Sequence, residues 1–195
     1  MKKAISIKEL INISYNRYKS KDAITINKGE YEKNINYFNY KFDIYSLARA
    51  LKSKQKNIKN QKVAILSENR YEFLVTYLAN IIVKNTVLII DSNLNKEVIE
   101  KIIKKHQINT IFFSEKNKEK IFEIYKLNEN NRKRKNLNLI SFEPINKYPI
   151  IEYEKLINIG RYIENYSIDN EVDAEEKCGP KISGFIKKTI KSTVK

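Results

Sequence analysis

Few residues in this chain are of the kinds that catalyse reactions by nucleophilic attack or proton transfer. The only histidine is His106 and the only cysteine is Cys178. A Ser–His or Cys–His pair would have to use His106, which follows Lys104 and Lys105 at the end of a helical pattern. The last carbonyl groups of a helix stabilise cations, so we interpret His106 as structural. One cysteine excludes an internal disulfide and a zinc site built from several cysteines.

Glycines matter for chemistry because backbone N–H groups must come close to a bound phosphate. The chain has four, and no two are spaced as in a dinucleotide-binding or P-loop fingerprint. Gly29 lies in a predicted hairpin turn and Gly160 in a helical pattern, while Gly179 and Gly184 follow near the C-terminal end. We therefore predict no catalytic, cofactor-binding or metal-binding residue in this chain.

The elements that would position a site alternate along the middle of the chain. Short apolar runs predict four strands, at 63–66, 86–90, 110–113 and 137–140. The first two are continuous apolar runs, typical of strands covered on both faces. Helical spacing predicts helices that begin after Asn69, at 95–106, around 121–125 and at about 151–165. Alternation of this kind predicts an α/β fold with a mainly parallel sheet and βαβ crossovers.

Capping patterns mark the starts of two predicted helices. Ser6 precedes helical spacing over 6–19, and Glu9 follows it by three residues, which is the pattern of a capping box. Asn69 and Glu72 repeat that spacing, so we predict a reciprocal cap there as well. Between these helices, the runs at 23–26 and 31–37 flank Asn27-Lys28-Gly29 and predict a β-hairpin, and 40–54 predicts a further helix.

The composition is that of a soluble globular protein with one domain: 195 residues, 42% apolar and 31% charged. No window reaches the roughly 18 apolar residues of a membrane span, and Lys8 and Glu9 interrupt any signal peptide, so we expect a cytoplasmic protein. The formal charge of +15 comes from lysines spread along the chain. Only residues 132–135 cluster, in a predicted surface loop, so we expect no specific nucleic-acid binding.

The composition changes sharply near Cys178. Residues 164–176 hold six acidic side chains and no basic one, whereas 177–195 hold six lysines and no acidic residue. Gly179-Pro180 would end regular structure at the same point.

The stretch from Lys62 to Phe73 resembles the early motif of AMP-forming acyl-CoA synthetases. It reads Lys-Val-Ala-Ile-Leu-Ser-Glu-Asn-Arg-Tyr-Glu-Phe, and residues 68–72 resemble the long-chain fatty acid branch of that family. The flanking segments 35–51, 86–94, 110–116, 154–160 and 168–176 resemble the family in order and spacing. The chain departs from the family at 83–85, which lacks the usual glycine, and at 89–90, which lacks the usual proline.

The resemblance implies a partial N-terminal AMP-binding domain over 1–178, of the adenylate-forming fold, followed by a non-homologous basic tail over 179–195. The implied function is that of the N-terminal fragment of a long-chain fatty acid–CoA ligase, inactive alone. The intact family uses ATP, Mg²⁺ and coenzyme A, and none of its catalytic positions falls within 1–178. Glu68, Asn69 and Arg70 are expected to cap and support a helix.

Two interpretations of the tail remain open. An abrupt change where the resemblance stops favours a truncated or frameshifted synthetase. Alternatively, Ile182, Phe185, Ile186, Ile190 and Val194 share one face of a basic amphipathic helix that contacts a membrane surface or a partner. The partner that we expect is the remainder of a split synthetase, which would make the chain a non-catalytic module.

Overall fold

A five-stranded parallel sheet forms the centre of the structure, which is a computed structural model that describes residues 6–29, 31–54, 61–129, 137–145 and 150–162. The strand order is β4-β3-β5-β6-β7, and every neighbouring pair is parallel. The strands are β3 (Lys62–Leu66), β4 (Thr86–Ile90), β5 (Thr110–Phe113), β6 (Asn138–Ser141) and β7 (Ile150–Glu152). This arrangement confirms the predicted α/β architecture.

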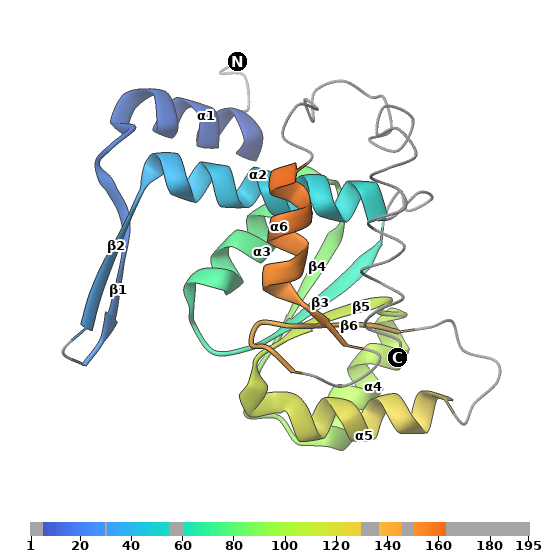
Figure 1. Cartoon of the computed structure of the whole chain (residues 1–195). Helices are drawn as coiled ribbons and strands as arrows, with labels where there is room; N and C mark the ends of the chain where they lie inside the picture. The colour runs from blue at the N-terminus through green and yellow to red at the C-terminus, as the bar shows by residue number, and fades with distance from the viewer. Residues whose placement is uncertain (1–5, 30, 55–60, 130–136, 146–149, 163–195) are drawn as a thin grey trace, which may run out of the picture.

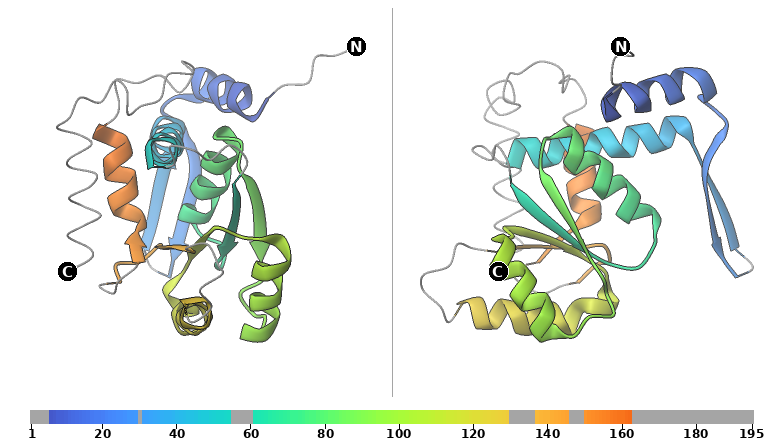
Figure 2. Two further views of the ribbon diagram at one scale, coloured as in Figure 1. Left: turned by 90° about the vertical axis from the view of Figure 1, so that its right-hand side faces the viewer. Right: turned by 180° about the vertical axis from the view of Figure 1, so that it is seen from behind.

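Helices cover both faces of this sheet (Figure 1). One face packs against α2 (Tyr37–Lys54), α3 (Tyr71–Ile82) and α6 (Tyr153–Tyr162), and the other against α4 (Lys96–His106) and α5 (Lys118–Glu129). Figure 2 shows the two helical layers from the side and from behind. A single turn of 3-10 helix, η1 (Glu115–Asn117), leads from β5 into α5.

The side chains of each strand alternate between the two layers, as strand geometry requires. In β5, Phe112 packs towards α2 and α6, and Phe113 packs towards α4 and α5. Both rings are fully buried, and burial of each contributes about 2–3 kcal/mol. The continuous apolar run of β3 follows from the same arrangement, because Val63 to Leu66 must be apolar on both sides.

The N-terminal elements lie outside the central sheet. Helix α1 (Ile7–Tyr18) runs beside α2, and β1 (Asp22–Lys28) pairs antiparallel with β2 (Tyr31–Asn36) in a separate two-stranded sheet that extends away from the body (Figure 1). The predicted capping box of α1 is confirmed, because Ser6 Oγ accepts from Glu9 N and the Glu9 carboxylate accepts from Ser6 N. No residue of α1 is fully buried.

Three sequence-based predictions were wrong. Helix α3 begins one residue later than expected, with Arg70 as its N-cap, and no side-chain cap forms there because an arginine side chain has no acceptor for a backbone N–H. Residues 150–152 form β7, so the last helix begins at Tyr153. Strand β4 is an edge strand that is partly exposed, not a strand covered on both faces.

Within the described ranges, no helix is both long enough and apolar enough to cross a membrane. The basic cluster at 132–135, the acidic stretch at 164–176, Cys178 and the tail at 179–195 all lie outside those ranges.

Candidate functional site: the carboxyl ends of the central strands

The strand order defines where a ligand would be expected in a sheet of this kind. Strand β3 is the first strand of the central sheet along the chain and lies between β4 and β5. The connection from β3 runs to β4 on one side, and the connection from β5 runs to β6 on the other side. Parallel α/β sheets bind ligands at such a switch point, outside the carboxyl ends of the strands. The residues that follow β3 and β5 here are Ser67 and Glu68, and Ser114 and Glu115.

An arginine occupies the centre of this edge. Arg70 Nε donates to Glu72 Oε2 at 2.8 Å, and one of its terminal nitrogens donates to Glu143 and lies 3.6 Å from Glu68. The guanidinium also lies over the ring of Phe142, with 5.1 Å between its carbon and the ring centroid. Arg70 thereby joins the loop after β3 to the loop after β6.

Carboxylates link this arginine to the loop after β5. Ser114 Oγ donates to Glu68 Oε2 at 2.7 Å, and the backbone N–H of Glu115 donates to Glu143 Oε2 at 2.7 Å. Asn117 donates to the Leu66 carbonyl and to Ser114 Oγ from within the core. Three loops that are far apart in sequence are therefore held by one hydrogen-bonded cluster.

This cluster shifts the pKa values of its members. Partial burial acts to raise the pKa of Glu68, but the hydrogen bond from Ser114 and the charge of Arg70 outweigh it, so that pKa is lowered. Burial acts to lower the pKa of Arg70, yet the bonds to Glu72 and Glu143 raise it. Both groups are held in their charged forms by each other and by their neighbours.

The cluster is suited to holding loops together and does not suit an anion. Three carboxylates, of Glu68, Glu72 and Glu143, surround the single guanidinium of Arg70, and its charge is already paired with theirs. A phosphate requires exposed N–H donors and a positive surplus. Among the residues that the structure describes, no group of three or more His, Cys, Asp and Glu side chains could hold a metal ion.

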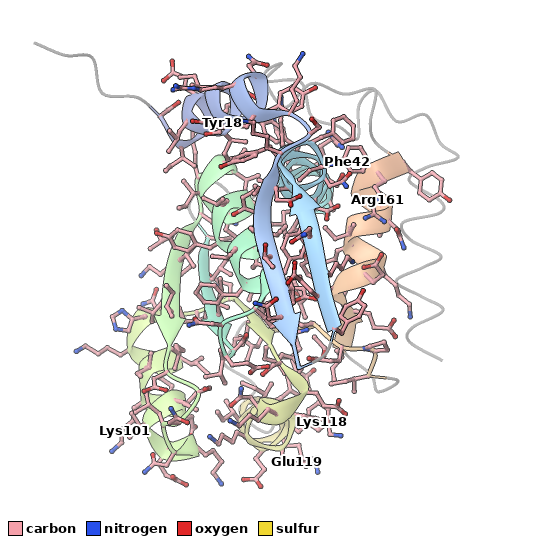
Figure 3. All side chains as sticks on the ribbon, turned by 90° about the vertical axis from the view of Figure 1, so that its left-hand side faces the viewer. Tyr18, Phe42, Lys101, Lys118, Glu119 and Arg161 are labelled. Atoms are coloured by element: carbon pink, nitrogen blue, oxygen red, sulfur yellow. The ribbon has the colours of Figure 1, made fainter. Side chains whose placement is uncertain are left out.

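A second polar cluster lies among α2, α3 and α6, the three helices that cover one face of the sheet. Tyr71 donates its phenolic O–H to Asp43 Oδ2 at 2.8 Å, and Arg161 Nη2 donates to Asp43 Oδ1 at 3.1 Å. Arg161 also lies over the ring of Phe42, which Figure 3 shows at the crossing of α2 and α6. Burial raises the pKa of Tyr71, and the negative charge of Asp43 raises it further. These contacts bind three helices together.

The histidine and two of the glycines considered in the sequence lie where they serve the fold. His106 ends α4 after Lys104 and Lys105, as predicted, and the structure shows that it is exposed. Gly29 has a positive φ of 64° in the hairpin turn. Gly160 lies in α6, where a Cβ atom would stand 1.7 Å from the carbonyl oxygen of Ser46 on α2. That glycine is therefore required for helix packing.

Sequence reasoning identified Glu68 and Arg70 but missed their partners. Ser114 and Glu143 lie 46 and 73 residues further along the chain from Glu68 and Arg70 respectively. The sequence did contain a signal for these partners. Ser114 and Glu143 each follow a predicted strand, and the carboxyl ends of parallel strands meet at one edge of the sheet. The expected cap at Asn69 was wrong, and the contacts of Glu68 and Arg70 with Ser114 and Glu143 join loops, whereas only the bond from Arg70 to Glu72 reaches α3.

The fold and this site define a doubly wound α/β domain in which a hydrogen-bonded cluster of the chain's own side chains lies at the switch point of the sheet. The family model for AMP-binding enzymes matches residues 13–174, most of the chain. The chain belongs to that family.

Solved structures similar to this chain are adenylate-forming enzymes. A candidate long-chain-fatty-acid CoA ligase from Rhodopseudomonas palustris CGA009 is 13% identical with a TM-score of 0.65, over 77% of this chain and 36% of that one. The A-PCP didomain of carboxylic acid reductase from Segniliparus rugosus, in complex with AMP, is 8% identical with a TM-score of 0.67, over 83% and 27%. Klebsiella oxytoca NpsA, in complex with 3-hydroxyanthranilyl-AMSN, is 14% identical with a TM-score of 0.54, over 87% and 28%.

At these identities the likeness establishes the fold alone, namely that of the N-terminal subdomain of adenylate-forming enzymes. The chain spans roughly a quarter to a third of the length of these structures. None of the curated proteins compared with the chain matches it. The described carboxyl edge does not fit the phosphates of the ATP that the family implies, because its surplus charge is negative and repels them.

Proposed function

We propose that this chain is the N-terminal part of an ATP-dependent long-chain fatty acid–CoA ligase and that it is inactive by itself. The observation that carries the proposal is the segment Glu68 to Glu72, which resembles the fatty acyl branch and lies inside the family match. The activity of the whole protein would join a fatty acid to AMP with release of pyrophosphate, and then transfer the acyl group to coenzyme A with release of AMP.

In such an enzyme, residues 68–72 would serve to hold connecting loops in place. They fix the loops after β3, β5 and β6 relative to one another, through Arg70, Glu68 and Ser114. If further residues of the whole protein complete an active site at this edge, the loops that support it would therefore be held in fixed positions. Stabilisation of the adenylyl group during its transfer needs preorganised donors, which the described edge does not supply, so we assign that task to residues outside this segment.

The experiment begins with the DNA that follows codon 178. The family that the chain resembles continues at this point with a phosphate-binding loop rich in Thr, Ser and Gly, which residues 179–195 do not resemble. We expect another reading frame to encode that loop. The open reading frame joined through that loop is then expressed, and ATP–pyrophosphate exchange is measured with acids of different kinds. Exchange should be fastest with long-chain fatty acids and absent for this chain alone. A preference for aryl acids or amino acids would overturn the assignment to fatty acids, and exchange by this chain alone would overturn the assignment of its inactivity.

A second candidate function is that of a non-catalytic module that binds the remainder of a split synthetase. It is favoured by apolar side chains left in solvent on the N-terminal elements. Leu10 and Ile13 of α1 are each 51% exposed, and Phe38 of α2 is 53% exposed. Exposed apolar patches of this kind mark binding surfaces. Co-expression with the downstream polypeptide tests it, and an unchanged soluble yield with no co-purification would remove this candidate.

A further inference from the structure

Aromatic rings and cations lie together along the seam between α1 and α2. On α2, Phe38, Lys41 and Phe42 follow one another at helical spacing and so share one face of the helix. The ring of Phe38 stacks on that of Phe42, with 6.3 Å between centroids, and lies 6.2 Å from the ring of Tyr15 on α1. Lys41 Nζ lies 4.2 Å from the centroid of Tyr15. We call Tyr15, Tyr18, Phe38, Lys41 and Phe42 the cationic aromatic face.

The cations at this face contact rings and not carboxylates. Lys41 lies over two tyrosine rings, and Lys21 and Arg17 lie over the ring of Tyr18 at 5.9 and 5.4 Å. Among the residues that the structure describes, no ion pair joins any of these three cations to a carboxylate. Burial lowers the pKa of Lys41, because its ammonium group loses water there. A carboxylate at this face would offset that loss.

The acidic residues of the two helices are already engaged elsewhere. Helix α1 contains one, Glu9, whose carboxylate accepts from Ser6 in the capping box. Helix α2 contains one, Asp43, which accepts from Tyr71 and Arg161. Neither helix therefore supplies a counter-charge to the cationic aromatic face.

Helix α6 brings the next part of the chain to this face. Arg161 lies over the ring of Phe42, with 5.9 Å between its guanidinium carbon and the ring centroid (Figure 3), and α6 ends at Tyr162. The stretch that follows, 164–176, holds six acidic side chains and no basic one. Apolar side chains lie among them in the sequence, namely Tyr166, Ile168 and Val172. An acidic segment with apolar residues therefore begins just beyond the point where α6 meets the cationic aromatic face.

We propose that residues 164–176 dock on the cationic aromatic face of the same chain, with their carboxylates beside Lys41, Lys21 and Arg17. Opposite charges attract more strongly where neighbouring rings exclude water. Reach is sufficient, because an extended chain spans up to about 3.3–3.6 Å per residue, or roughly 40 Å over this stretch. Docking would cover part of α1, in which no residue is fully buried. The inference goes beyond the proposed function, because it depends on charge and chain order and not on the reaction.

Carbodiimide cross-linking of the full chain tests the contact, because this reagent joins a lysine to a carboxylate only where the two groups meet. Lys52 is the matched control, since it is also a partly buried lysine of α2 with no described ion pair. Links from Lys41 to residues 164–176 should exceed those from Lys52 at least about fivefold. Equal yields would show that the stretch reaches both lysines without docking. That result, or the absence of links at Lys41, overturns the proposal.

Isotope labelling distinguishes docking within one chain from docking between two copies. Unlabelled and heavy-isotope-labelled chains are mixed at about 5 µM, where a tethered segment, at an effective concentration in the mM range, should prevail over free copies. Links should then join peptides of the same isotope. Links between light and heavy peptides in statistical proportion would overturn the assignment to the same chain. Sodium chloride at about 0.5 M should reduce the links, because it screens the attraction.

Neutralisation of the stretch provides a second measurement. All six acidic residues are replaced by amides: Glu164→Gln, Asp169→Asn, Glu171→Gln, Asp173→Asn, Glu175→Gln and Glu176→Gln. Lys41 then loses its counter-charges, and its acetylation should become about three- to tenfold faster, since one pKa unit changes the fraction of neutral amine tenfold. Acetylation of Lys52 should change less than about twofold. An unchanged rate at Lys41, in a variant that urea unfolding shows to be folded, would contradict the proposed contact.

Discussion

At the scale of single residues, Arg70 connects parts of the fold that are far apart in sequence. Its guanidinium reaches Glu72 in its own helix, Glu143 after β6 and Glu68 after β3, and its charge also lies over the ring of Phe142. The side chain is 18% exposed, so these contacts are screened by water less than ordinary surface pairs. Loss of the arginine would leave three carboxylates close together without a counter-charge.

We therefore predict that Arg70→Met lowers the free energy of unfolding at pH 7 by about 3 kcal/mol. The folded pKa of Glu68 is lowered, so its stabilising contribution is present above the unfolded value of 4.5 and is lost as pH falls through the folded pKa. The variant keeps the hydrogen bond from Ser114 to Glu68 but loses the part of that contribution that comes from the charge of Arg70, so the stability difference between the two proteins should be smaller below pH 4.5 than at pH 7. Urea unfolding at both pH values measures this.

Lys101→Met is the control for that prediction, because Lys101 is an exposed cation on α4 (Figure 3), and the contacts of Arg70 described above come from other elements. It should change stability by less than about 0.5 kcal/mol at either pH. An Arg70→Met loss that is the same at neutral and acid pH would show that packing on Phe142, and not charge pairing, accounts for the effect.

At the scale of elements, the close crossing of α2 and α6 fixes one face of the sheet. Gly160 touches the backbone of Ser46, Arg49 Nε donates to the Gly160 carbonyl at 3.0 Å, and Arg49 also donates to Ser46 Oγ at 3.1 Å. Backbone cannot move aside as a flexible side chain can, so any larger residue must push the helices apart. Leu156 and Ile157 of α6, which are nearly fully buried, would lose packing at the same time.

We predict that Gly160→Ala destabilises the protein by about 3 kcal/mol, at the upper end for an overpacked core. Gly29→Ala is the matched control, because a Cβ there has nothing within 4 Å and only the positive φ of 64° opposes it. That strain should cost about 1–2 kcal/mol. Thermal and urea unfolding of both variants test the ranking. A larger loss at Gly29 would mean that the helix crossing relaxes more easily than the structure implies.

The sequence predicted the type and order of most elements, because buried strands and amphipathic helices have distinct periods. It could not separate β4 from a central strand, since Val87 to Ile90 is apolar whichever position the strand takes. Strand β7 was missed because its three residues merge with the helical spacing that follows. The role of Gly160 could not be predicted either, because its neighbour Ser46 is 114 residues earlier and only the folded chain brings them together.

Sequence reasoning located only part of the cluster at the candidate site. Residues 68–72 form a continuous motif, so sequence could locate them. Their partners Ser114 and Glu143 are single polar residues after separate strands, and pairing them requires knowledge of the strand order. That order places β5 beside β3 and β6 beside β5. The sequence therefore located one side of the cluster, and the topology supplied the other.

At the scale of the whole molecule, the net charge of +15 is the main electrostatic feature. Its lysines are spread along the sequence and over the surface, so they repel one another in the folded state more than in the expanded chain. The described ion pairs are mostly at the surface, where each contributes about 0–1 kcal/mol. Net repulsion should therefore exceed the gain from local pairs at low ionic strength.

We predict that sodium chloride stabilises this protein, by on the order of 1 kcal/mol between about 0.01 and 0.3 M, because the screening length falls from about 30 Å to below 10 Å. Urea unfolding across this range measures the effect, and choline chloride at the same ionic strength should reproduce it. Lys33→Glu with Lys101→Glu exchanges two exposed positive charges for negative ones, so the double variant should respond less to salt. Stability that falls with added salt in the unmodified chain would show that local pairs such as Lys96–Glu123, at 2.6 Å, outweigh the net charge.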